Sequence, residues 1–244
     1  MGTPREELIF IPAWNEEGSL PDVLDELSAE LPEADILVVD DGSTDRTAEV
    51  AREHGAQVLS FGENRGLRAA IAAGYGYAAE HGYAFCGRVD ADGQHPVAEL
   101  RKLLELVRSG EWDVAVGSRF ATAGGNGFSR ERYESSAARR LGTGLLRRSM
   151  EVVLDEPFHD PTSGMYAVNA RALPLLARPY SSGAPEVEGI LRLHDEGLRV
   201  TEVPVEMRER AVGESKLHGK KAIVLVFTVA GALITAELLR RRRP

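Results

Sequence analysis

The sequence predicts an α/β fold in which helices cover both faces of a mostly parallel sheet. Short apolar segments alternate with amphipathic segments through the first half, which is typical of consecutive strand–helix units. The apolar run at residues 36–39 is continuous, as expected for a strand that is buried on both faces. A polar cluster follows each of the first four predicted strands, and ligands of parallel sheets bind beyond such strand ends.

The predicted elements of the first half follow one another with short connections. The first strand covers residues 8–11, and the helix at 21–31 carries its leucines on one face. The helix at 45–54 is expected to begin after Ser43 or Thr44 as its N-cap. The other predicted elements are strands at 36–39, 57–60, 83–89 and 113–117 and helices at 67–81 and 96–109.

The second half of the chain is less regular. Its predicted features are a glycine-rich loop at 124–127, an arginine-rich helix at 130–154, a turn at 160–164, a helix at 186–196 with a C-cap near Gly197, and a strand at 199–205. Because no internal repeat or low-complexity linker interrupts residues 1–218, we expect them to form one domain.

Composition and charge limit the classes of function. The net charge of −9 argues against a nucleic-acid partner, because phosphate backbones require a basic surface. The single cysteine, Cys86, excludes an internal disulfide and fits a reducing compartment, and its apolar surroundings predict a core thiol. A strand-like segment begins by Leu8, which leaves no room for a signal peptide, so we expect a cytoplasmic protein.

Residues 219–244 predict a separate apolar helix with basic ends. Its uncharged part, residues 222–236, is too short to cross the roughly 30 Å hydrocarbon core of a bilayer. A helix that lies in the membrane interface, with its basic ends on anionic lipid, fits this pattern. A buried core helix and a contact between two copies of the chain, in a homodimer, are the alternatives.

The polar clusters lie at residues 15–17, 40–43, 64–66 and 90–92. Separate solvated turns would have the same composition, but their common edge of the sheet favours a single site. If the chain stays extended, Asp90 and Asp92 project to the same side, and Gln94 continues that spacing. Two carboxylates and an amide oxygen suit Mg²⁺ or Mn²⁺. A solvated turn is again the alternative for so short a motif.

Other side chains at this edge have the chemistry to bind a nucleoside or a phosphate; they are Trp14, Glu16, Asp40, Asp41, Arg65 and Arg68. Each has a structural alternative. The tryptophan can pack in the core, and the aspartate pair can cap the helix that follows it.

Seven motifs occur in a recognisable order: IPAWNEEGSL, VVDDGSTDRT, NRGLRAAIAAGY, VDADGQHP, VGSRF, DPTSGMYAVN and RAVGESK. With them the chain resembles family 2 glycosyltransferases, in the branch of dolichol-phosphate mannose synthase and bacterial polyprenyl-phosphate glycosyltransferases. The resemblance covers residues 8–216 and implies the GT-A fold, a Rossmann-like sheet. It divides the domain into a nucleotide-binding half, about 1–120, and an acceptor half, about 121–218.

The resemblance also implies roles for individual residues. Those expected to bind the nucleotide sugar are Pro12, Trp14, Glu16, Asp40, Asp41, Arg65, Asp90 and Ser215. Those expected to hold the metal are Asp90, Asp92 and Gln94. Those expected at the acceptor are Arg119, Arg132, Ser136 and Asp160. The residues expected to be catalytic are Asp90, Asp92, Arg210 and Lys216. Trp14 stands where tyrosine is usual, and Met165 replaces the branch's usual phenylalanine.

The implied reaction moves a hexose from a GDP- or UDP-sugar to a polyprenyl phosphate, with inversion and with Mg²⁺ or Mn²⁺ as cofactor. A lipid phosphate is already anionic, so it needs orientation more than deprotonation; a hydroxyl acceptor would need a general base, for which Asp160 is the candidate. Glu186 and Glu188 are candidates for binding sugar hydroxyls, or are solvated acids in a first helical turn.

A lipid acceptor would place the protein peripherally on the inner face of the cell membrane. Two other functions stay open. The same fold could glycosylate a soluble small molecule or a polysaccharide. Alternatively, the chain could bind nucleotide sugars without turnover, as a subunit of a membrane complex.

Overall fold

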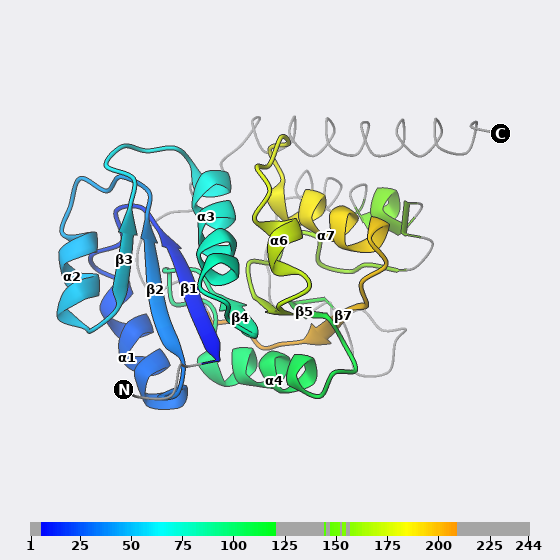
Figure 1. The fold of residues 1–244 in the computed structure, drawn as a ribbon, viewed down its shortest axis with the longest axis horizontal. Coiled ribbons are helices and arrows are strands. Elements are labelled where there is room, and N and C mark those ends of the chain that lie inside the picture. The colour runs from blue at the N-terminus through cyan, green and yellow to red at the C-terminus, as the bar shows by residue number, and fades with distance from the viewer. Residues whose placement is uncertain (1–5, 121–143, 145–146, 152, 155–156, 209–244) are drawn as a thin grey trace.

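The strands of the computed structural model, which describes residues 6–120, 144, 147–151, 153–154 and 157–208, form one twisted sheet (Figure 1). Its order is β3-β2-β1-β4-β6-β5-β7, and all pairings are parallel except those of β6 with β4 and β5. The strands are β1 (Glu7–Ala13), β2 (Asp35–Asp40), β3 (Gln57–Ser60), β4 (Phe85–Arg88), β5 (Val114–Ser118), β6 (Tyr166–Asn169) and β7 (Val200–Pro204).

Helices cover both faces of this sheet, as the sequence predicts. They are α1 (Leu20–Glu30), α2 (Thr47–Glu53), α3 (Leu67–Glu80), α4 (Val97–Arg108), α6 (Leu173–Leu176) and α7 (Pro185–Asp195). One core cluster lies between the sheet and α3, α6 and α7, and a second lies between the sheet and α1 and α4 (Figure 1). Cys86 is fully buried in the first cluster, which confirms a core thiol.

The structure differs from the prediction at two places. Strand β6 and the short helix α6 were not predicted, and β6 inserts antiparallel between β4 and β5. The N-cap prediction for α2 was also wrong, because the Thr47 N–H donates to Asp45 Oδ1 at 3.0 Å. Ser43 and Thr44 instead bind Asn15 across the strand ends.

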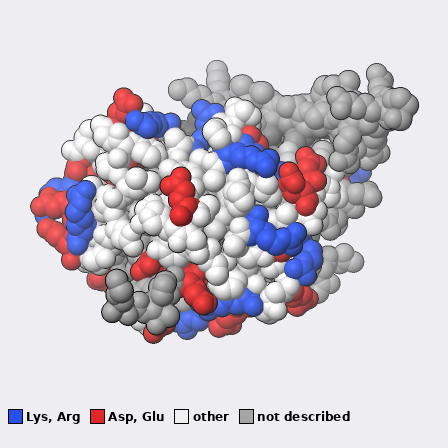
Figure 2. All heavy atoms as spheres, in the orientation of Figure 1, with Lys and Arg blue, Asp and Glu red and all other residues white. Residues whose placement is uncertain are grey.

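Several predicted features lie outside the described residues. They are the loop at 124–127, most of the helix at 130–154, the segment 219–244, and the residues Arg132, Ser136, Arg210, Ser215 and Lys216. Within the ranges that the structure does describe, no helix is both long and apolar enough to cross a bilayer. Figure 2 shows acidic and basic side chains intermingled on the face viewed, so the charge there does not gather into one patch of a single sign.

Asp113 anchors the start of β5 and supplies a stability prediction. Its buried carboxylate accepts hydrogen bonds from Asn169, from Arg171 and from both the backbone and the side chain of Arg199. Burial by itself raises the pKa of Asp113, but these hydrogen bonds and the charge of Arg171 lower it from 3.8 to about 2.

We therefore expect Asp113→Asn to lower the free energy of unfolding at pH 7 by about 1–3 kcal/mol. Because the pKa is depressed in the folded state, the contribution of the carboxylate is complete above pH 3.8 and is lost as the pH falls toward 2. Urea unfolding of both proteins at pH 7 and near pH 2.5 tests this. The difference should shrink at the lower pH; a difference that is equal at both would contradict the account.

Candidate functional site

The first three polar clusters meet at the carboxyl edge of the sheet through hydrogen bonds. Asn15 follows β1, and its backbone N–H donates to Ser43 Oγ at 3.0 Å, while its Oδ1 accepts the Thr44 N–H at 2.8 Å. Asn15 adopts a left-handed backbone, with φ of 54°, which asparagine tolerates better than most residues. The loops after β1 and β2 are thus fastened to each other.

The aspartate pair after β2 shapes these loops. Asp40 Oδ1 accepts the Ser43 N–H at 3.0 Å, and its Oδ2 accepts the Ser60 hydroxyl at 2.7 Å. Asp41 accepts the N–H groups of Arg65 and Gly66 at the start of α3, at 2.6 and 2.9 Å. Both carboxylates are buried and bind groups of the protein, but neither caps α2, the helix that follows them. Their contact with a nucleoside stays a prediction.

The other predicted nucleoside residues differ in exposure. Trp14 is 39% exposed, which excludes the core-packing alternative and leaves its ring accessible at the edge. Pro12 is buried within β1, where it pairs with Val39 of β2. Glu16 Oε2 accepts a hydrogen bond from the Ser19 hydroxyl at 2.8 Å, so part of its carboxylate is used at the start of α1.

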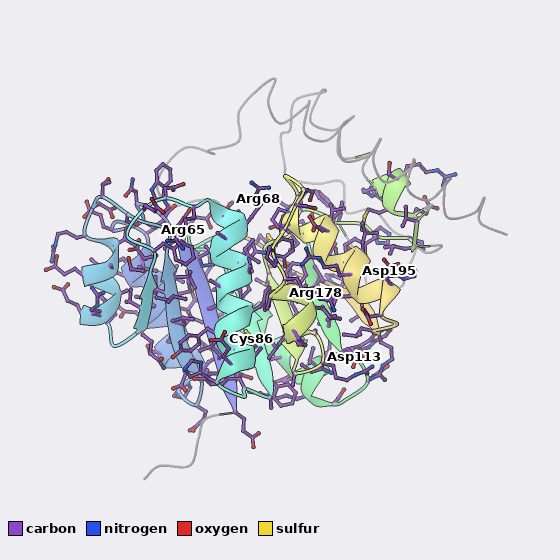
Figure 3. The ribbon with its side chains drawn as sticks, turned by 45° about the horizontal axis from the view of Figure 1, so that its top comes forward. Arg65, Arg68, Cys86, Asp113, Arg178 and Asp195 are labelled. Carbon is purple, nitrogen blue, oxygen red and sulfur yellow. The ribbon has the colours of Figure 1, made fainter. Side chains whose placement is uncertain are left out.

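The two arginines near the start of α3 make different contacts. Figure 3 shows Arg65 and Arg68 near the same end of α3. The Arg65 side chain is 54% exposed and lies 5.1 Å from the centre of the Phe61 ring. Arg68 donates to the carbonyls of Ser181 and Ser182, so it braces the loop before α7. Of the two, Arg65 is the better placed for a phosphate.

Asp90 lies two residues beyond the end of β4, the strand that pairs with β1. Its side chain is 38% exposed, and Arg88 Nη2 lies 3.6 Å from Oδ1. Burial tends to raise the pKa of Asp90, but nearby His95 and Arg88 lower it below the ordinary value. The chain does not stay extended here, because a turn begins at Ala91, so the alternation argument for Asp92 does not apply.

Asp92 and Gln94 are held within this turn. Asp92 is 8% exposed, and its Oδ1 accepts the Gln94 N–H at 3.1 Å. The Gln94 carbonyl accepts the Arg208 N–H at 2.9 Å, and Arg208 forms a bidentate pair with Glu26 of α1. The turn is therefore tied to the segment that immediately precedes residue 209, a connection that the sequence did not suggest.

These residues fit a divalent cation by the chemistry of their donors. Among the residues placed by the structure, no group of three His, Cys, Asp or Glu side chains could hold a metal. Mg²⁺, however, commonly takes one or two protein carboxylates and completes its shell with water and phosphate oxygens. A partly exposed, ionised Asp90 supplies one such carboxylate, and Asp92, two residues further along the chain, is the candidate for the second.

Arg119 is paired with Asp160 in the turn at 160–164, and Gly164 of this turn lies against the Asp90 carboxylate. The Asp160 carboxylate is fully buried and accepts from Arg119 Nε and Nη2, both at 2.7 Å. Its Oδ1 also accepts the Thr162 hydroxyl, and its backbone N–H donates to Glu202. So enclosed a carboxylate is poorly placed to act as a general base, and it instead orients the Arg119 guanidinium.

The two glutamates of α7 are mostly buried and have different partners. Glu188 accepts from Ser181, Ser182 and Arg192, and although burial raises its pKa, these hydrogen bonds lower it to about 2. It stabilises the start of the helix. Glu186 instead points toward the sheet and binds Arg88 at 3.0 Å.

Comparison with known proteins places this site in context. The sequence profile described as Glycosyl transferase family 2 matches residues 8–173. The polyprenol monophosphomannose synthase of Mycolicibacterium smegmatis is 32% identical, over 98% of this chain and 91% of that protein. The undecaprenyl-phosphate mannosyltransferase of Micrococcus luteus is 34% identical, over 87% of each.

A solved structure shares the fold. Glucosyl-3-phosphoglycerate synthase from Mycobacterium tuberculosis, crystallised with Mn²⁺, UDP and glucosyl-3-phosphoglycerate, superimposes with a TM-score of 0.69 at 20% identity. The match covers 96% of this chain and 80% of that one. At this identity the likeness supports the GT-A architecture and says nothing further of the substrate.

Proposed function

Since this chain belongs to glycosyl transferase family 2, we propose that it transfers a hexose from a nucleotide sugar to the phosphate of a polyprenyl lipid. It is a glycosyltransferase, and relatives named for polyprenyl-phosphate acceptors match it over most of their length. The observation that carries the proposal is geometric. The polar loops after β1, β2 and β3 lie at one edge of the sheet with residues 90–94, the Asp90 turn, which follow β4. Arg119 binds the turn at 160–164, whose Gly164 lies against Asp90.

In the proposed reaction, an oxygen of the acceptor phosphate attacks the anomeric carbon as the nucleoside diphosphate leaves. A single displacement of this kind inverts the anomeric centre. Arg119, oriented by Asp160, would bind the acceptor phosphate, and a phosphate needs no general base. Arg132 and Ser136, outside the described residues, are proposed to share this contact.

The donor diphosphate is proposed to lie at the Asp90 turn. Asp90 and Asp92, with Gln94, would hold a divalent cation, Mg²⁺ or Mn²⁺, which when bound supplies positive charge that stabilises the leaving group. Trp14 would stack on the base, and Arg65 would meet the phosphates. Arg210, Ser215 and Lys216, which lie outside the described residues, are proposed to close on the diphosphate.

The donor and the acceptor can be tested separately. A panel of UDP- and GDP-sugars, with Mg²⁺ or Mn²⁺, is first scored by thermal shift to find the stabilising nucleotide. That sugar is then incubated with a polyprenyl phosphate and with soluble acceptors. A glycosylated lipid supports the proposal. Product only on a soluble acceptor favours the same-fold alternative, and nucleotide binding without any product favours a non-catalytic subunit.

The membrane half of the proposal makes its own prediction. Residues 219–244 combine an apolar stretch with basic ends, which suits peripheral binding to the inner face of the membrane. Truncation after Gly219 should release the protein from anionic liposomes and slow transfer to a long-chain lipid, while sparing a short soluble phosphate acceptor. If the full-length protein stays in the supernatant and the truncated one is insoluble, the segment belongs to the core or to a dimer contact.

A further inference from the structure

Strand β4 ends in an arginine whose side chain is buried. Arg88 is only 3% exposed, and it shares the face of the sheet that carries Cys86, beneath α3, α6 and α7. Its surroundings are largely aromatic and apolar, including Tyr75 and Tyr166, at a cavity of about 10 Å³. Burial of a guanidinium in such a place is costly unless carboxylates pair with it.

Arg88 contacts two carboxylates: that of Asp90, two residues further along the chain, and that of Glu186, in α7. Its Nη2 donates to Glu186 Oε1 at 3.0 Å, across a separation of 98 residues, and lies 3.6 Å from Asp90 Oδ1. Burial lowers the pKa of Arg88, but the negative charges of Glu186 and Asp90 raise it above its ordinary value, so the guanidinium stays charged. It also offsets the repulsion between two acids that would otherwise face each other.

The Asp90 carboxylate is confined from a second side by Gly164. A Cβ atom at residue 164 would lie 2.9 Å from both Asp90 Cγ and Oδ1, so any other residue there would push the carboxylate out of its present position. Asp90 is therefore seated between the backbone of the turn at 160–164 and the guanidinium of Arg88. This double restraint acts on the residue that the proposed function assigns to the cation and the donor diphosphate.

We propose that Arg88 is a positioning residue, which fixes the Asp90 carboxylate for a divalent cation and, through Glu186, ties helix α7 to the same edge. The inference rests on the proposed function, because it assumes that Asp90 holds the cation. A partner that orients a metal ligand typically contributes 10–100-fold to metal affinity or activity. Arg88 does not itself touch the donor in this account.

The test compares Arg88→Lys with Arg192→Lys. Arg192 is a comparable structural arginine, since it is mostly buried, is paired with Glu188 on α7, and donates to the carbonyls of residues 175, 178 and 179. Mn²⁺ is titrated by calorimetry into each protein saturated with GDP or UDP, whichever stabilises the wild type. We expect Arg88→Lys to weaken Mn²⁺ affinity by about 10–100-fold. Arg192→Lys should bind Mn²⁺ like the wild type, even if its melting temperature falls.

A wild-type Mn²⁺ affinity in Arg88→Lys would overturn the role of Arg88. If that variant does not fold, the neutral pair Arg88→Gln with Glu186→Gln removes both charges and keeps a polar side chain at each position. The same loss of Mn²⁺ affinity is expected there, and an unchanged affinity would again overturn the proposal. A wild-type protein that binds no Mn²⁺ with either nucleotide would instead contradict the metal assignment, and this inference with it.

Discussion

Replacing Asp90 with asparagine is expected to slow sugar transfer by at least about 10²–10³-fold, because the variant keeps the shape of the side chain and loses its charge. Asp90 is the more exposed of the two acids in the Asp90 turn. Removal of its charge also leaves Glu186 as the one charged partner that the described residues give Arg88. Initial rates at saturating Mn²⁺ and donor measure the effect.

Asp22→Asn is the matched control, since Asp22 is an exposed acid in the first turn of α1. It should transfer sugar at the wild-type rate. If Asp90→Asn keeps more than a tenth of the wild-type rate, or the wild type works fully in excess EDTA, the metal assignment is wrong. Circular dichroism spectra that match the wild type would show that the loss is not one of folding.

Replacing Arg119 with methionine is expected to affect both stability and transfer. It leaves the fully buried Asp160 carboxylate without its charged partner, and breaking such a pair typically costs about 3–5 kcal/mol. Transfer should also fall, because the proposed acceptor phosphate loses its oriented guanidinium. Urea unfolding and initial rates, measured on the same preparation, separate the two effects.

The double variant Arg119→Met with Asp160→Asn distinguishes structure from function. It removes the stranded charge, so we expect much of the lost stability to return. Transfer should remain low, because no guanidinium is restored. A double variant that regains wild-type transfer would show that Arg119 only supports the fold, and the acceptor assignment would then need another residue.

Much of the sheet could be predicted because most of its strands are marked by local sequence patterns. The continuous apolar run of β2 and the alternating helices required no knowledge of tertiary contacts. Strand β6 was missed because it is defined by its position between β4 and β5, to which it pairs antiparallel. Pairing at long sequence separation leaves little trace in local composition.

The candidate site could likewise be predicted only in part. The polar clusters were predictable from their positions after strands, but their hydrogen-bond partners were not. Arg88 looked like the last residue of a strand, and only the fold brings Glu186 to it. Asp160 was expected at the acceptor, and as the base only for a hydroxyl acceptor, yet its carboxylate is already paired with Arg119 across 41 residues.

The measurement that tests the central claim most directly compares two acceptors that differ only in phosphate. The wild-type protein, its stabilising nucleotide sugar and Mn²⁺ or Mg²⁺ are incubated with a polyprenyl phosphate or with the corresponding free polyprenol, and the lipids are analysed by mass spectrometry. We expect a polyprenyl-phosphate hexose from the first acceptor and no product from the second. Transfer to the free alcohol, or to neither lipid while a soluble acceptor is glycosylated, would contradict it.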